Sequence, residues 1–202
     1  MGRLPGKFWK IYVVSADGGS LQQMTSGAGN DGDPNWSPEG NQIVFGGEPG
    51  LETTSQSPNM ALQILDLTNG HASVVPGSEN LFSPRWSPDG RYIAAQSAGS
   101  THLLLYDARG QKWQNLGEVN AGYFSWSHDG KYIYLTTEGP DFVFGRIKVP
   151  DEHGIETLAS LKGVRLFNGT FGIWTGIAPD DSLLVLRDTS SDEIYALELQ
   201  SP

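Results

Sequence analysis

Cysteine is absent from the 202 residues of this chain. Its absence excludes disulfide bridges and thiolate metal sites. It is compatible with an oxidising or a reducing compartment, so it does not indicate where the protein works.

Basic residues are few, with 13 lysines and arginines against 23 aspartates and glutamates and a formal net charge of −10 at pH 7. A surface with this charge repels phosphate groups. We therefore expect this segment neither to bind nucleic acid nor to contact an anionic membrane surface.

Long apolar runs are also missing. No run approaches the roughly 18 apolar residues that mark a membrane-spanning helix. The run Ile11–Val14, which follows three basic residues near the N-terminus, is too short for a signal-peptide core of about 7–15 residues. The sequence predicts neither a signal peptide nor a transmembrane segment.

Motifs of known catalytic sites are absent too. The chain has no Gly-x-Ser-x-Gly nucleophile elbow and no phosphate-binding loop ending in Gly-Lys. No segment keeps the 3.6-residue period of an amphipathic helix, so essentially no helix is expected. We predict a non-enzymatic protein without a cofactor.

A short motif is repeated along the chain. Trp-Ser-Pro-Glu-Gly at Trp36–Gly40 returns at Trp86–Gly90 and Trp126–Gly130, and in altered form at Ile177–Asp181. Seven residues after the first member of each copy stands an aliphatic residue, namely Ile43, Ile93, Ile133 or Leu184. Four copies with one offset identify a tandem repeat.

Each repeat reads as four short strands separated by turns. The 26 glycines and 12 prolines lie at regular intervals between apolar runs, which is typical of an all-β protein. Four antiparallel strands in about 40–50 residues form the blade of a β-propeller. We predict an incomplete ring of about four blades after an N-terminal hairpin. The ranges are 1–29 for the partial blade, 30–78, 79–118 and 119–162 for complete blades, and 163–202 for a blade lacking its outer strand.

The motif residues have a structural explanation. Each tryptophan should lie on an innermost strand, wedged against the next blade, where burial of the ring contributes roughly 3 kcal/mol or more. Trp86→Ala should therefore be among the most damaging substitutions. Proline and glycine fit a type I turn, and the aspartate caps nearby N–H groups. This structural role is assigned to Trp36, Pro38, Gly40, Trp86, Pro88, Asp89, Gly90, Trp126, Asp129, Gly130, Pro179 and Asp180.

Candidate metal ligands show no convergent spacing. The four histidines (His71, His102, His128 and His153) are spread over the repeats, and a zinc site is not predicted. The segment Asn30–Asp33 is rich in oxygen ligands but lacks the downstream glutamate of a calcium-binding loop. A solvated turn is the favoured interpretation.

Residues just before each motif differ in chemistry from repeat to repeat. They should lie near one mouth of the propeller, where a constant scaffold carries a variable surface. The alternative is that they only line the channel and pack between blades. The binding candidates are Asp33, Asn35, Arg85, Tyr123 and Trp174.

These features together resemble a known family. Trp86–Gly90, followed by an aliphatic strand and then a strand ending in Asp and Gly, is similar to the repeat of TolB-type β-propellers, which are WD-like in architecture. The resemblance covers nearly the whole chain, although Glu39, His128 and the Ile177–Asp181 copy depart from the pattern. The end of the chain, with Glu193–Leu197, resembles the last blade of bacterial proteins in which such a propeller follows a winged-helix or serine/threonine kinase domain.

The resemblance implies a protein- or peptide-binding or sensory module at the C-terminal end of a larger bacterial regulatory protein. The alternatives are an accessory propeller that gates a serine peptidase and a structural half-ring completed by oligomerisation. The implied location is periplasmic or extracytoplasmic if the parent protein is anchored in a membrane, and cytoplasmic otherwise.

The two ends of an incomplete ring should promote self-association. An open arc leaves two apolar blade faces bare, which favours self-association. As an alternative, Leu21–Thr25 of the N-terminal hairpin could pair with a strand predicted at Glu193–Leu199 and seal the ring within one chain.

Overall fold

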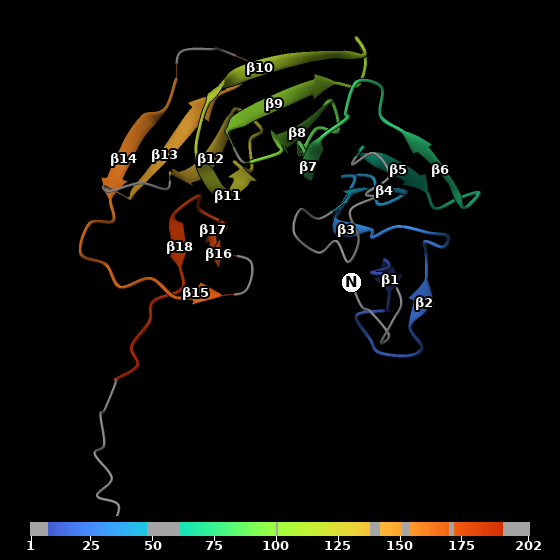
Figure 1. Cartoon of the computed structure of the whole chain (residues 1–202), viewed down its shortest axis with the longest axis horizontal. Helices are drawn as coiled ribbons and strands as arrows, with labels where there is room; N and C mark the ends of the chain where they lie inside the picture. The colour runs from blue at the N-terminus through green and yellow to red at the C-terminus, as the bar shows by residue number, and fades with distance from the viewer. Residues whose placement is uncertain are drawn as a thin grey trace, which may run out of the picture.

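A computed structural model of the chain describes residues 8–47, 61–99, 101–137, 142–150, 154–169 and 172–191. Within these ranges it contains eighteen β-strands and no helix. The strands form several separate antiparallel sheets arranged in an arc (Figure 1). The prediction of an all-β propeller is confirmed.

Three sheets are complete blades, each with its four strands paired in chain order. The first consists of β3 (Gly32–Trp36), β4 (Gln42–Gly46), β5 (Gln63–Asp66) and β6 (His71–Val74). The second consists of β7 (Leu81–Trp86), β8 (Tyr92–Ser97), β9 (His102–Asp107) and β10 (Lys112–Glu118). The third consists of β11 (Ala121–Trp126), β12 (Tyr132–Thr137), β13 (Val143–Lys148) and β14 (Glu156–Ser160). We call them blades 1, 2 and 3.

The N-terminal end of the arc carries half a blade, formed by β1 (Tyr12–Val13) and β2 (Gln22–Gln23). The N–H of Met24 donates to the carbonyl of Ile11 at 2.8 Å, just as that of Val75 donates to Leu62 at 2.9 Å in blade 1. In blade 1 this hydrogen bond joins the third and fourth strands. The β1–β2 hairpin is therefore the outer half of a blade.

The C-terminal end carries an inner half-blade, β17 (Thr175–Ile177) paired with β18 (Leu183–Val185). A short hairpin that the sequence did not predict precedes it, formed by β15 (Asn168–Gly169) and β16 (Gly172–Ile173). The third strand predicted at Glu193–Leu199 lies outside the described residues, and so does the pairing of that strand with Leu21–Thr25.

The arc is open. In Figure 1 the β1–β2 hairpin and the last half-blade lie at opposite ends of the arc, and no sheet of the described residues contains strands from both ends. The predicted incomplete ring is confirmed.

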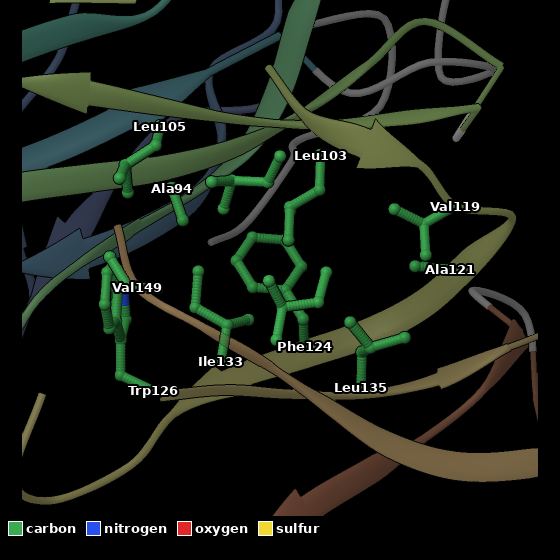
Figure 2. Close-up of a cluster of buried hydrophobic side chains, with 12 residues drawn as sticks. Ala94, Leu103, Leu105, Val119, Ala121, Phe124, Trp126, Ile133, Leu135 and Val149 are labelled. Carbon is green, nitrogen blue, oxygen red and sulfur yellow. The ribbon is translucent and has the colours of Figure 1, made fainter. Parts of the chain in front are cut away.

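The core lies between blades rather than inside one layer. Figure 2 shows the largest cluster, where Leu103 and Leu105 of blade 2 meet Phe124, Trp126 and Ile133 of blade 3. The second strand of each complete blade is almost fully buried on both faces, which explains its continuous apolar sequence. Successive residues of this strand alternate between the two neighbouring blades.

The motif tryptophans pack against the preceding blade, so the predicted contact with the next blade is wrong. Trp126 is 8% exposed and lies in the cluster shared with blade 2, and Trp86 is half-buried against blade 1. Trp36 is 49% exposed, and the described part of the half-blade before it consists of outer strands. The tryptophans do lie on the first strand of each blade, as predicted.

The repeat offset also has a structural cause, and the fourth copy departs from it. Each motif tryptophan is paired with the aliphatic residue seven positions later across the turn, as Trp126 is with Ile133. In the last half-blade Ile177 pairs with Leu183, because this turn is one residue shorter. The predicted counterpart, Leu184, therefore points to the opposite face and is 44% exposed.

Candidate functional site

Four of the five candidate binding residues lie on the first strands of the blades, which face the middle of the arc in Figure 1. The fifth, Trp174, directly precedes the first strand of the last half-blade. Just before the motif, the ladder is irregular between Gly32 and Asn35 and between Phe82 and Arg85. Asp33 (φ 48°) and Ser83 (φ 54°) adopt the left-handed conformation there. Such backbone is costly for residues other than glycine, and it re-aims the side chains that follow.

These strained positions bring blades 1 and 2 together. Asp33 accepts hydrogen bonds from the hydroxyl of Ser83 and, at 2.9 Å, from the guanidinium of Arg85. The amide oxygen of Asn35 accepts from the N–H of Trp86 at 2.8 Å. Three of the five binding candidates, Asp33, Asn35 and Arg85, thus have partners across a blade junction.

Arg85 extends this contact to blade 3. Its guanidinium lies 5.9 Å from the centre of the Phe124 ring, and its carbonyl accepts a hydrogen bond from the indole Nε1 of Trp126 at 3.0 Å. Gln96 adds a second link by donating to the carbonyls of Ala121 and Gly122 at 2.8 and 3.0 Å. We did not single out Gln96 from the sequence, although a glutamine inside the buried run of β8 is a signal that it needs a hydrogen-bond partner.

The remaining two candidates, Tyr123 and Trp174, occupy the same position of the repeat in blade 3 and in the last half-blade. Tyr123 is half-buried, whereas Trp174 is 45% exposed. They lie on β11 and close to β17, whose neighbouring positions Phe124 and Thr175 are buried. Of the five candidates, Trp174 is the one with a largely exposed aromatic side chain.

The motif turns stack along the arc. The third motif residue of one blade lies against the fifth motif residue of the next, as Pro88 does against Gly130. At the last junction these positions hold His128 and Asp181, whose Nδ1 and Oδ1 are 2.6 Å apart. Asp181 adopts the left-handed conformation (φ 61°) that glycine has in the other copies. His128, in place of proline, and Asp181, in place of glycine, therefore replace the usual contact between neighbouring turns by a polar one.

The motif aspartates cap their own turns. Asp129 accepts from the hydroxyl of Ser127 at 2.8 Å and from the N–H of Lys131 at 3.0 Å, and the ammonium of Lys131 lies 2.9 Å away. The backbone N–H and then the ammonium of Lys131 lower the pKa of Asp129 to about 2. Hydrogen bonds from Ser182 likewise lower the pKa of Asp180.

This geometry predicts an acid-sensitive turn. Since the folded-state pKa of Asp129 is depressed from 3.8 to about 2, its contribution to stability is present above about pH 4 and is lost as the pH falls towards 2. Asp129→Asn should flatten this part of the curve of melting temperature against pH. Thermal unfolding followed by circular dichroism between pH 2 and pH 7 measures it. Parallel curves for the two proteins would contradict the prediction.

Within the described ranges, no group of three or more His, Asp or Glu side chains is arranged to hold a metal ion, and no helix could cross a membrane. His71, His102 and His128 lie apart on different elements, and His153 is outside these ranges. The ammonium of Lys10 donates to the carboxylate of Asp31 at 2.7 Å and to the carbonyl of Gly29 at 2.8 Å. The acidic Asn30–Asp33 segment is therefore already paired with a positively charged side chain.

Comparison with solved structures identifies the fold. TolB from Acinetobacter baumannii matches with a TM-score of 0.67 and 17% identity, over 91% of this chain and 44% of that chain. A putative TolB from Agrobacterium tumefaciens matches with a TM-score of 0.65 and 19% identity, over 88% and 64%. Oligogalacturonate lyase from Vibrio parahaemolyticus matches with a TM-score of 0.55 and 12% identity, over 72% and 43%. The predicted TolB-type propeller is confirmed as a fold.

Sequence comparison finds a weaker resemblance than comparison of structures does. The chain matches no protein-family model. It is 29% identical over 90 residues to an uncharacterized protein of Agrobacterium fabrum, which corresponds to 42% of this chain and 31% of that protein. The chain therefore spans less than two thirds of the length of the proteins it resembles.

Proposed function

We propose that the chain is a non-enzymatic binding module that contacts a protein or peptide partner through Tyr123 and Trp174. The observation that carries the proposal is the exposure of Trp174, at 45%, directly before the first strand of the last half-blade. Large aromatic residues dominate the binding energy of many protein interfaces. The TolB-type fold supports the proposal, because the resemblance implies partner binding.

The remaining candidates have another role in this proposal. Asp33, Asn35 and Arg85 hold blades 1 and 2 in position and so shape the surface beside the two aromatic residues. The net charge of −10 favours a partner segment with basic residues, because complementary charge accelerates association and fixes orientation.

The test selects peptides from a displayed random library on the immobilised protein. Peptides bound by the wild type should bind Trp174→Ala at least about tenfold more weakly, as the loss of an aromatic anchor requires. Trp36→Ala is the matched control, since Trp36 is equally exposed but lies in blade 1. Equal binding to all three proteins, or no selectable peptide, would contradict the proposal.

The wider context is a separate part of the proposal. We place the module at the C-terminal end of a larger bacterial regulatory protein, outside the cytoplasm if that protein is anchored in a membrane. The coding sequence immediately upstream tests this. A winged-helix or kinase domain there is the expected result, whereas a serine hydrolase domain would favour the peptidase-gating alternative.

A further inference from the structure

Two exposed aromatic side chains near the last half-blade each lie over a glycine. Phe167 and Trp174 are 48% and 45% exposed. A Cβ atom at Gly169 would lie 3.3 Å from Cε1 of Phe167, and a Cβ atom at Gly176 would lie 3.1 Å from Cζ2 and Cη2 of Trp174. Residues two positions apart in an extended chain share a face. Each ring therefore rests on the backbone of the glycine that follows it, in a space that a larger side chain would crowd.

The β15–β16 hairpin brings the two aromatic residues to one surface. The residues that pair at its base, Asn168 and Ile173, directly follow Phe167 and directly precede Trp174. The N–H of Phe167 also donates to the carbonyl of Leu186, in the strand that continues β18, at 2.8 Å. Strands β15 to β18 lie together in Figure 1. Phe167 is therefore a neighbour of Trp174, although the sequence did not single it out.

A ring that rests on the backbone offers its other face to a ligand. The face of an aromatic ring carries negative potential and attracts cations, most strongly for tryptophan. The chain itself contains such contacts. The guanidinium groups of Arg91 and Arg146 lie 4.7 and 4.1 Å from the centres of the rings of Tyr92 and Tyr132.

The charge of the chain favours a cationic ligand at these rings. Its formal net charge is −10, which attracts a basic partner and repels an acidic one. Arg165 lies two residues before Phe167, but its guanidinium is paired with the carboxylate of Asp188 at 3.1 Å. This pair adds no net charge beside the rings. Among basic side chains, the planar guanidinium of arginine stacks best on an aromatic face.

We infer that the partner contacts Phe167 and Trp174 through arginine side chains, whose guanidinium planes stack on the two rings. The inference rests on the proposed function, because it names the chemistry of the partner at the site of Trp174. It adds Phe167 as a second binding residue. It also assigns a role to Gly169 and Gly176, which give the rings room to lie against the backbone.

Fluorescence anisotropy with labelled peptides selected on the wild-type protein tests the inference. Peptides whose binding requires Trp174 should contain arginine. Replacing that arginine by citrulline, its neutral isostere, should weaken binding by about three- to thirtyfold, the range for a cation–π contact. Phe167→Ala should weaken binding by a similar factor. Phe8→Ala is the matched control, since Phe8 is 43% exposed in the N-terminal segment, and it should bind like the wild type.

Two further variants separate a cation–π contact from simple apolar packing. Trp174→Leu keeps apolar surface but removes the aromatic face, so it should bind as weakly as Trp174→Ala. Gly176→Ala should weaken binding while the ring is still present, because the new Cβ displaces the ring of Trp174. All variants should keep the far-ultraviolet circular dichroism spectrum of the wild type.

The outcomes distinguish this inference from the proposed function. Peptides that require Trp174 but contain no arginine would overturn the inference and leave the proposed function intact. Wild-type affinity of the citrulline peptide, or of Trp174→Leu for the arginine peptide, would do the same. If no selected peptide required Trp174, both would fail.

Discussion

Replacing Trp126 by alanine should lower the free energy of unfolding by about 3–5 kcal/mol, the usual cost of truncating a buried aromatic residue. The same substitution at Trp36 should cost less than about 1 kcal/mol, as is typical of surface positions. Both residues open the same motif, so the sequence alone gives them equal weight. Their exposures of 8% and 49% separate them.

The difference comes from what precedes each residue. Trp126 packs against apolar residues of blade 2 and donates a hydrogen bond to the carbonyl of Arg85. Alanine would leave a cavity between two blades and an unpaired carbonyl. Trp36 is 49% exposed, so replacing its ring by a methyl group removes little packing.

Urea denaturation followed by far-ultraviolet circular dichroism measures both effects, provided that the slope with denaturant stays constant. Trp86→Ala should fall between the two, because Trp86 is half-buried against blade 1 and its Nε1 has no hydrogen-bond partner in the described part of the chain. Equal destabilisation by Trp126→Ala and Trp36→Ala would show that the motif tryptophans do not depend on the preceding blade.

Asp33→Ala should destabilise the protein by about 1–3 kcal/mol, because it leaves the guanidinium of Arg85 without its carboxylate at a junction where both groups are mostly covered. The side chains of Arg85 and Asp33 are 18% and 25% exposed, so solvent screens the pair only in part. Ser83 also loses its acceptor.

A double-mutant cycle with Arg85→Ala isolates the pair. We expect a coupling energy of about 1 kcal/mol or more between Asp33 and Arg85, in the range for residues that share one network. The control is the same cycle on Asp129 and Lys131, whose side chains are 48% and 70% exposed, and it should give a smaller coupling energy because solvent screens the pair. A coupling energy of zero would mean that Asp33 and Arg85 do not join blades 1 and 2.

Much of the architecture could be predicted from the sequence, because local patterns set it. The motif with its aliphatic residue seven positions later fixes a turn between two paired strands, and this holds for Trp36, Trp86 and Trp126. The fourth copy misled the prediction. Its turn is one residue shorter than the others. The constant offset in the sequence predicted Leu184 as the partner of Ile177, whereas the strand pairing shows that Leu183 is the partner.

The contacts between blades could not be predicted, because they join residues that are far apart in the sequence, 51 positions for Asn35 and Trp86 and 53 for His128 and Asp181, with no local signal. From the sequence, Asp33 and Asn35 are interpreted as residues of the propeller rim. The structure shows that they form hydrogen bonds with Arg85 and Trp86 of the next blade. The pairing of His128 with Asp181 is a similar case. Each residue is an unexplained departure from its own motif, and only their proximity shows that they belong together.

The repeated motif builds the arc, and we propose that Trp174, one of the variable residues before it, contacts a partner. The most direct measurement titrates a peptide selected on the wild-type protein against Trp174→Ala and Trp36→Ala by calorimetry. We expect both variants to fold as the wild type does, Trp174→Ala to bind the peptide at least about tenfold more weakly, and Trp36→Ala to bind it with wild-type affinity. Full binding by a folded Trp174→Ala protein would contradict it.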